Sequence, residues 1–85
     1  MKEFSYKIKD SVGIHARPAG ELVKTAAEFE SSIKIKMGEK LADAKKIFSV
    51  MALGAVQNDE VLVTVEGSDE DAAFEKVKKF FEDRL

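Results

Sequence analysis

Two hydrophobic periods run along the chain, one typical of strands and one typical of helices. Apolar residues alternate with polar ones over residues 4–8, 33–37 and 61–65, which predicts strands with one buried face. A short extended segment follows at Lys40–Asp43. Helical spacing covers residues 16–29 and 73–81, and residues 46–53 are apolar on nearly all sides. The predicted order of elements is therefore βαββαβα.

Four local signals set the expected ends of these elements. Pro18 falls in the first helical turn, where its missing N–H costs nothing. Gly38 and Glu39 suit a tight hairpin turn, and Gly54 offers a stop after the short helix 46–53. Ser68 is expected to cap the last helix, with an acidic first turn at residues 69–71.

Length and composition indicate one α+β domain spanning residues 1–85. We expect a four-stranded antiparallel sheet with three helices on one face and a wet opposite face. A chain of this size has no room for a deep pocket, so a functional site is expected on the surface. The N-terminus lacks the apolar stretch of a signal peptide, and no apolar run reaches the length of a membrane span, so we expect a cytoplasmic protein without membrane insertion.

Charge is unevenly distributed. The net charge of −2 argues against a dedicated nucleic-acid binder. Residues 1–58 hold ten Lys/Arg against seven Asp/Glu, whereas residues 59–85 hold four against nine. A basic face could attract an acidic partner, but the pattern also fits an ordinary solvated mixture of charges. The basic residues near the two motifs described below are Arg17, Lys24, Lys40, Lys45 and Lys46.

Several classes of site have no support in the sequence. A single histidine without cysteines leaves too few ligands for a transition-metal centre, and no acidic spacing fits an EF-hand loop. The glycine-rich nucleotide-binding motifs and the serine-hydrolase elbow are also missing from the sequence. We therefore expect no metal and no cofactor.

His15, the single histidine, lies in the run GIHARPA (residues 13–19), where a strand pattern gives way to a helix. A helix start presents unpaired N–H groups and a positive dipole end, which favour an anion on the capping side chain. The Arg17 guanidinium matches phosphate oxygens. The residues therefore allow a phosphate-accepting imidazole, and equally a surface histidine without chemistry.

The short helix 46–53 presents two apolar faces. Val50 and Leu53 share one face, while Ile47, Phe48 and Met51 share another. If one face enters the core, the other forms an exposed apolar cluster with lysines 45 and 46 at its rim, as in a docking patch for partner proteins. Burial of both faces is the alternative.

The two motifs together, GIHARPA and KKIFSVMALG (residues 45–54), resemble those of the HPr family. These are the histidine-containing phosphocarrier proteins of the bacterial phosphoenolpyruvate-dependent sugar phosphotransferase system. The resemblance covers nearly the whole chain and implies an open-faced β-sandwich of order βαββαβα. It also implies a carrier, not an enzyme, that takes a phosphoryl group from phosphorylated Enzyme I and passes it to IIA domains of sugar permeases. We expect a monomer.

The resemblance also implies residue roles. His15 would accept the phosphoryl group at Nδ1, Arg17 would assist it, and the helix start at Ala16 and Pro18 would support it. The implied partner-docking residues are Gly20, Lys24, Ile47, Phe48 and Met51. Two other functions remain open: a regulator whose phosphorylation state controls another protein, and an interaction module without chemistry.

Lys46 departs from the family pattern. In the Gram-positive branch this position holds a regulatory serine, whose phosphorylation opposes Enzyme I docking and creates a complex with a transcription regulator. Lysine cannot be phosphorylated in that way, and Ser49 is not an evident substitute. The sequence therefore predicts no regulatory serine, and a fixed positive charge at position 46 should favour an acidic partner.

Overall fold

The computed structural model describes residues 1–85 and contains the seven elements in the predicted order. The strands and helices alternate as the hydrophobic periods indicate, and the fold class is confirmed. The bounds of the elements are β1 Lys2–Lys7, α1 Ala16–Ala26, β2 Ser32–Met37, β3 Lys40–Asp43, α2 Ile47–Ala52, β4 Glu60–Glu66 and α3 Glu70–Arg84.

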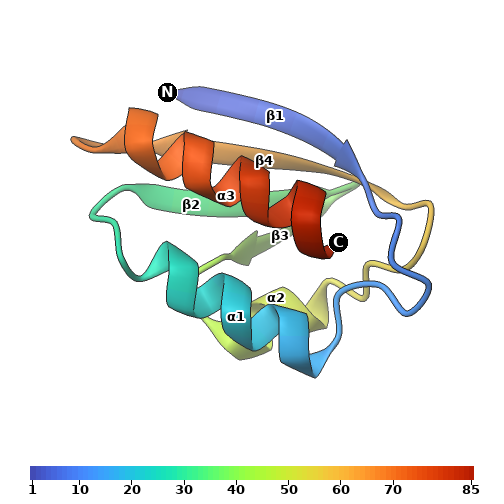
Figure 1. Cartoon of the computed structure of the whole chain (residues 1–85). Coiled ribbons are helices and arrows are strands. Elements are labelled where there is room, and N and C mark those ends of the chain that lie inside the picture. Colours follow the sequence, from blue (N-terminus) through green and yellow to red (C-terminus); the bar gives the residue numbers. More distant parts are fainter.

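The four strands form one antiparallel sheet in the order β1-β4-β2-β3 (Figure 1). Its register places alternate rows of side chains on opposite faces, as the period of two requires. One row across the sheet is buried and consists of Phe4, Val63, Ile35 and Ala42. The next row faces away from the core and consists of Ser5, Leu62, Lys36 and Leu41.

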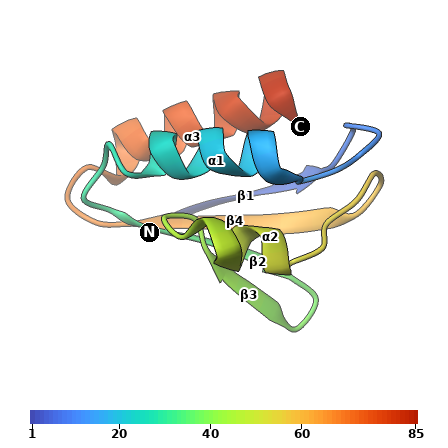
Figure 2. The same cartoon turned by 90° about the horizontal axis from the view of Figure 1, so that it is seen from below.

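The helices cover the buried face and leave the other open. In Figure 2, α1 and α3 lie side by side and run in opposite directions, so the end of α3 lies near the start of α1. Two ion pairs join α3 to α1 and to the segment that follows it: Arg84 pairs with Glu21, and Lys76 pairs with Glu28. The shorter α2 contacts α1 and β3, at one side of the same face.

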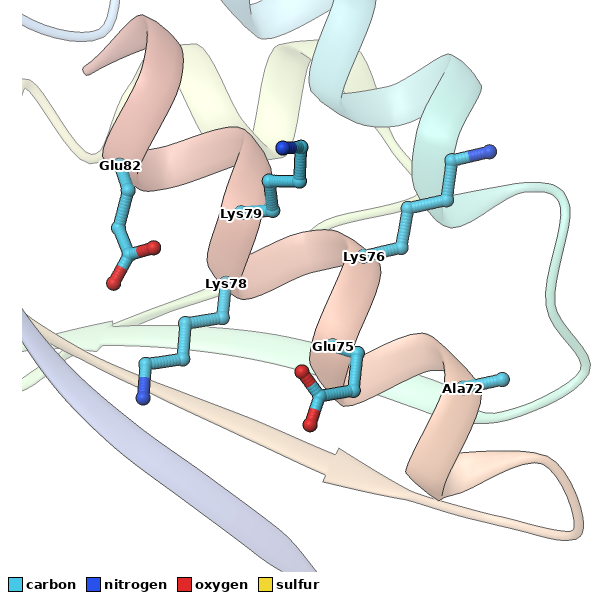
Figure 3. A pocket seen from close by; sticks show the side chains of 6 residues that line it. All are labelled: Ala72, Glu75, Lys76, Lys78, Lys79 and Glu82. Atoms are coloured by element: carbon cyan, nitrogen blue, oxygen red, sulfur yellow. The ribbon is translucent and has the colours of Figure 1, made fainter.

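The outward face of α3 is highly charged and forms the largest surface hollow, of about 530 Å³ (Figure 3). Its wall is made almost entirely of lysine and glutamate side chains, and none of the predicted site residues contributes to it. We interpret this hollow as a solvated helix face. The lining residues are Ala72, Glu75, Lys76, Lys78, Lys79 and Glu82.

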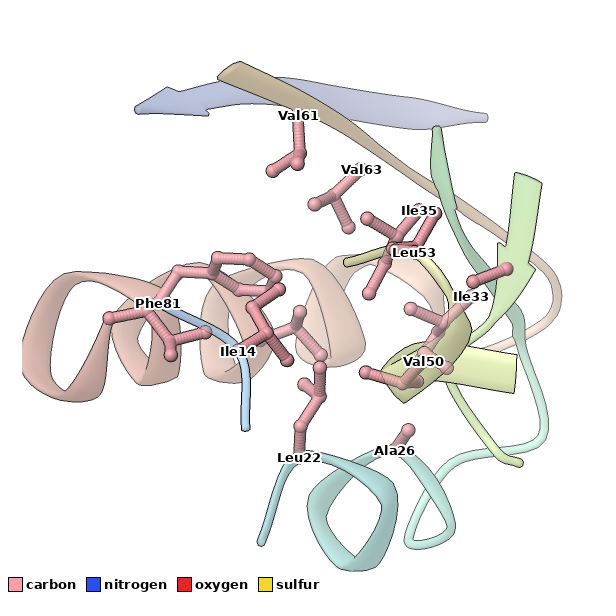
Figure 4. Close-up of a cluster of buried hydrophobic side chains, with 14 of the residues drawn as sticks. Ile14, Leu22, Ala26, Ile33, Ile35, Val50, Leu53, Val61, Val63 and Phe81 are labelled. Carbon is pink, nitrogen blue, oxygen red and sulfur yellow. The ribbon is translucent and has the colours of Figure 1, made fainter. Parts of the chain in front are cut away.

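The core lies between the sheet and the helices (Figure 4). Leu22 of α1, Val50 of α2 and Phe81 of α3 point into it and are fully buried, as the helical stripes predict. The Phe81 ring meets Phe4 and Tyr6 of β1 edge-on, at centroid distances of 5.7 and 5.5 Å. Edge-to-face packing of this kind holds α3 against the first strand.

Helix α1 ends three residues earlier than predicted. It ends at Ala26. The amides of Glu28 and Phe29 donate hydrogen bonds to the carbonyls three residues earlier, those of Thr25 and Ala26, both at 3.2 Å. Such bonds tighten the last turn of a helix. Phe29 still packs against the core, so its apolar signal reflected burial and not helix.

The predicted cap of α3 is also wrong. Asp69, not Ser68, is the N-cap residue, and the Ser68 hydroxyl instead donates to the Glu30 carboxylate at 3.1 Å. The Asp69 carboxylate accepts from the amides of Glu30 and Ser31, each at 2.9 Å, and from the Ser31 hydroxyl. Ser31 is fully buried, so Asp69 supplies the partner that a buried hydroxyl needs.

The helices of the chain are all too short and too polar to cross a membrane.

We predict that Asp69→Ala lowers the free energy of unfolding in a pH-dependent manner. Hydrogen bonds from the Ser31 hydroxyl and then the Glu30 amide hold the pKa of the Asp69 carboxyl below its usual value. A lowered pKa stabilises the fold above the unfolded-state value of about 4, and this stabilisation disappears as the pH falls through the folded-state value. Denaturation of wild type and variant should therefore differ at pH 7 and converge in acid. Asp71→Ala, which removes an exposed ion pair, should change little; a gap for Asp69→Ala that persists throughout the acid range would contradict the prediction.

Candidate functional site

His15 is the N-cap residue of α1, at the strand-to-helix transition that the sequence predicts. Its backbone is extended, with φ −112° and ψ −173°, and its carbonyl accepts the first helical hydrogen bond from Ala19 at 2.9 Å. The side chain is exposed and forms no hydrogen bond with the protein. Both ring nitrogens are therefore available to a group that approaches from solvent.

The helix start beside His15 presents free donors. The amides of Ala16 and Arg17 have no acceptor in the protein, and Pro18 has no N–H to leave unpaired. The Arg17 side chain is exposed and forms no ion pair, whereas Pro18 is buried and fixes the turn. Two amides and one guanidinium thus lie next to the imidazole in sequence, which is a donor set suited to phosphate oxygens.

The β1–α1 loop, residues 8–15, is held in place by the side chain of its residue Asp10 and by the residue that follows α3. The Asp10 carboxylate accepts from the amides of Val12 at 2.8 Å and Gly13 at 3.2 Å, which closes a tight turn. The Asp10 amide donates to the carbonyl of Leu85 at 2.8 Å. Because the imidazole makes no bond of its own, this backbone network sets its position.

A second loop, the α2–β4 loop of residues 53–59, packs directly against the first at Gly13. Gly13 has φ +86°, and a Cβ added there would lie 2.3 Å from the carbonyl oxygen of Ala55. The next residue, Ile14, donates its amide to that same oxygen at 3.0 Å. The α2–β4 loop is closed in turn by the Asp59 carboxylate, which accepts from the Val56 amide at 3.0 Å. Glycine is therefore required at position 13 by both conformation and space.

Helix α2 has the two faces that its sequence predicts. Val50 and Leu53 are buried on one face, whereas the exposed side chains of the opposite face exclude the alternative in which both faces are buried. On that side Phe48 is 82% exposed, Met51 is 38% exposed and Ile47 is partly buried. An exposed aromatic and methionine on one short helix is the composition of an adaptable protein-binding patch.

Asp43 sets the position of α2. Its amide donates to the Ser49 hydroxyl at 2.9 Å, and its carboxylate accepts from the Lys45 amide at 2.9 Å. The hydrogen bond from the Lys45 amide lowers the pKa of the Asp43 carboxyl, and the positive charge of the Lys34 ammonium, 3.5 Å away, lowers it further. Because the partly buried Ser49 hydroxyl accepts the Asp43 amide, it joins α2 to the end of β3.

Lys45 differs from its neighbour Lys46. Its ammonium donates to the carbonyl of Phe29 at 2.7 Å, across to the segment that follows α1. The Lys45 ammonium is therefore held in place by a backbone hydrogen bond, which no local sequence pattern indicates. Lys46, the N-cap residue of α2, is exposed and forms no ion pair.

The two sequence motifs form one continuous surface, because α1 and α2 pack against each other (Figure 1). Gly20 lies at the junction, where an added Cβ would sit 3.7 Å from Cδ1 of Ile47. Of the five basic residues considered in the sequence, only Lys45 is engaged, and the others form no ion pair. We use the name docking surface for the five predicted docking residues together with the neighbouring Arg17: Arg17, Gly20, Lys24, Ile47, Phe48 and Met51.

Sequence reasoning missed two apolar side chains on the loops beside His15. Val12 is 60% exposed and Val56 is 51% exposed, and their loops meet at Gly13. Both lie outside the regular elements, so no periodicity marks them.

Comparisons with known proteins agree with this arrangement. The family model described as "PTS HPr component phosphorylation site" matches residues 2–83. The phosphocarrier protein HPr of Lysinibacillus sphaericus is 45% identical over 75 residues, which cover 88% of this chain and 85% of the relative. A Mycoplasma histidine-containing phosphocarrier protein aligns with a TM-score of 0.93 and 39% identity, over 96% of this chain and 93% of its own. An HPr of Thermoanaerobacter tengcongensis aligns with a TM-score of 0.91 and 39% identity, over 96% of this chain and 92% of its own. A structure described as an HPr dimer from that organism aligns with a TM-score of 0.78 and 38% identity, over 99% of this chain and 97% of its own.

We predict that Gly13→Ala is more destabilising than Gly38→Ala. Both positions have positive φ, which costs a non-glycine residue about 1 kcal/mol, but Gly38 has open space around it. Gly13→Ala adds the clash with Ala55, so its loss in free energy of unfolding should exceed that of the control by at least about 1 kcal/mol. Urea denaturation measures the difference, and amide NMR shifts should change at Ile14 and His15. Equal losses in the two variants would show that the loops do not need their close approach.

Proposed function

Because the chain belongs to the HPr family of phosphocarrier proteins, which carry a phosphoryl group and are not catalytic enzymes, we propose that His15 is its phosphoryl acceptor. The Nδ1 atom receives the group from phosphorylated Enzyme I and passes it to a IIA domain of a sugar permease. The observation that carries this proposal is an exposed imidazole without a hydrogen bond, at a helix start whose first two amides, those of Ala16 and Arg17, have no partner.

The transfer exchanges one bond for another. The lone pair on Nδ1 attacks phosphorus, and a phosphorus–nitrogen bond forms as the bond between phosphorus and the Enzyme I residue breaks. At the IIA domain the same exchange runs outward, and the imidazole leaves as a neutral ring.

The residues around His15 stabilise the group only modestly, which suits a carrier. A helix N-terminus stabilises an anion by about 0.3–2 kcal/mol, and each further ~1.4 kcal/mol would hold the group tenfold more tightly. The Ala16 and Arg17 amides and the Arg17 guanidinium donate hydrogen bonds to the phosphoryl oxygens. Pro18 fixes the helical turn that presents the two amides. An enclosed site with more donors would retain the group instead of releasing it.

We assign partner binding to the docking surface. Phe48 and Met51 supply apolar area, Ile47 and Gly20 connect the two helices, and Lys24 and Arg17 supply unpaired positive charge. Sequential partners then use the same face, because each must bring its phosphoryl-bearing group to His15. The protein works in the cytoplasm as a monomer, since one copy holds the acceptor and the whole docking surface.

Position 46 carries a fixed positive charge in place of a regulatory serine. Lys46 occupies the N-cap of α2, next to the exposed Phe48, where its ammonium adds attraction for an acidic partner. Ser49 is a poor substitute for the serine, because its hydroxyl already accepts the Asp43 amide. We therefore exclude serine-dependent switching from the proposed function.

The experiment is phosphorylation of the whole chain with phosphoenolpyruvate and Enzyme I, followed by mass spectrometry. We expect one acid-labile phosphoryl group on wild type and none on His15→Ala. Addition of a IIA domain should remove the group from wild type.

Two further measurements test the other parts of the proposal. Replacing the donor by ATP and a serine kinase of the family should add no phosphoryl group, and light scattering should give the mass of one chain.

Each other outcome points to a different function. An unmodified wild type, with an Enzyme I that phosphorylates a known HPr, would rule out the carrier. Phosphorylation without onward transfer to any IIA domain would favour a regulatory role. Partner binding that survives His15→Ala but is lost in Phe48→Ala, without phosphorylation of wild type, would favour an interaction module.

We predict that Phe48→Ala weakens Enzyme I binding, whereas Leu41→Ala leaves it unchanged. Both side chains are large, apolar and exposed, at 82% and 65%, but Leu41 lies on the open face of the sheet. Truncating a central aromatic residue of an interface costs about 1–2 kcal/mol or more, so the dissociation constant should rise at least fivefold. Calorimetric titration measures both variants. Equal effects would place the docking surface elsewhere.

A further inference from the structure

Glu21 is the only acidic residue in α1 and lies between the two cations of the docking surface on that helix. Arg17 is four residues before it and Lys24 is three residues after it. Residues at these spacings are neighbours on one helix face, with about 5–6 Å between their Cβ atoms. The Glu21 carboxylate is therefore able to reach either cation.

In the structure Glu21 pairs with neither. Its Oε2 atom accepts a hydrogen bond from the Arg84 guanidinium at 2.5 Å, across the gap between α1 and α3. Arg17 and Lys24 form no ion pair. The antiparallel arrangement in Figure 2 places the last turn of α3, which carries Arg84, beside the first turns of α1.

The end of α3 that carries Arg84 is itself fixed. Leu85 is buried, its amide donates to the carbonyl of Phe81 at 2.9 Å, and its own carbonyl accepts the Asp10 amide. Arginine in the last turn is also favoured by the negative end of the helix dipole. The guanidinium therefore meets Glu21 from an anchored backbone.

We infer that Arg84 is a positioning residue: it holds the Glu21 carboxylate away from Arg17, so that the Arg17 guanidinium stays free for the phosphoryl group on His15. This inference rests on the proposed function of Arg17. Without Arg84 the nearest free cation for Glu21 in the direction of His15 is Arg17, one helical turn away. A carboxylate bound there competes with the phosphoryl oxygens and adds negative charge near them.

The kinetic test compares initial rates of His15 phosphorylation by Enzyme I in four variants. An i,i+4 ion pair on a helix shifts an equilibrium roughly twofold, so Arg84→Ala should slow the chemical step about two- to threefold. The effect should fall on kcat more than on KM. Glu21→Gln combined with Arg84→Ala should restore the wild-type rate, Arg84→Lys should retain it, and Arg84→Ala should have no further effect in an Arg17→Ala background.

Lys76→Ala is the matched control. Lys76 pairs with Glu28 at 2.7 Å, so this variant also removes an exposed ion pair, in this case between α3 and the segment that follows α1. Glu28 lies beyond the end of α1 and three helical turns from Arg17, so its release should leave the rate unchanged. A comparable loss in Lys76→Ala would mean that helix docking, not Glu21, controls the rate, and would overturn the inference.

A second measurement does not depend on phosphoryl transfer. In the unphosphorylated protein the NMR signal of the Arg17 Nε–H group should shift in Arg84→Ala and return in the Glu21→Gln, Arg84→Ala double variant. An unchanged Arg17 signal, a shift of Lys24 alone, or a rate loss that Glu21→Gln fails to restore would each overturn the inference. If Arg17 shifts as expected while wild type accepts no phosphoryl group, the pairing is established and the proposed function is the part that fails.

Discussion

The contact between Gly13 and Ala55 is the constraint on which the site depends. The His15 imidazole has no hydrogen bond to the protein, so only its backbone determines where it lies. That backbone is fixed where the Ala55 carbonyl accepts the Ile14 amide and lies too close to Gly13 for any side chain. Ala55 in turn follows α2, so a single contact ties His15 to the helix that carries Phe48. The geometry of the carrier is thus set through loops, and not through bonds to its reactive ring.

The order and type of all seven elements followed from hydrophobic period, because local spacing decides which face of an element is buried. The two errors arose where distant residues decide the outcome. Phe29 continues the apolar spacing of α1, yet it packs on the core from outside the helix. Ser68 has the chemistry of a cap, but Asp69 takes the position and turns its carboxylate to Ser31, 38 residues away. No local pattern contains that hydrogen bond.

The candidate site divides in the same way. His15 and the exposed face of α2 were accessible to sequence reasoning, because a helix start and an unusually apolar short helix are local features. The engagement of Lys45 with the Phe29 carbonyl and of Arg84 with Glu21 joins segments 16 and 63 residues apart. Whether a basic residue is free or paired therefore had to come from the fold. Charge counting along the chain treats all lysines and arginines alike, whereas a cation in an ion pair adds less to the field that a binding protein meets than a cation without a counter-charge.

The distribution of paired and free cations gives the molecule its polarity. On α3 three of the four cations, Lys76, Lys79 and Arg84, are in ion pairs, and Lys78 lies over the Phe74 ring at 5.6 Å, so most of the positive charge of that helix is locally balanced. On α1 and at the start of α2, Arg17, Lys24 and Lys46 have no partner. Unpaired charges of one sign repel one another, but they steer an oppositely charged partner toward the protein. Exposed ion pairs, by contrast, contribute little to stability. A chain with net charge −2 can therefore still attract an acidic partner to the part of its surface formed by α1 and the start of α2.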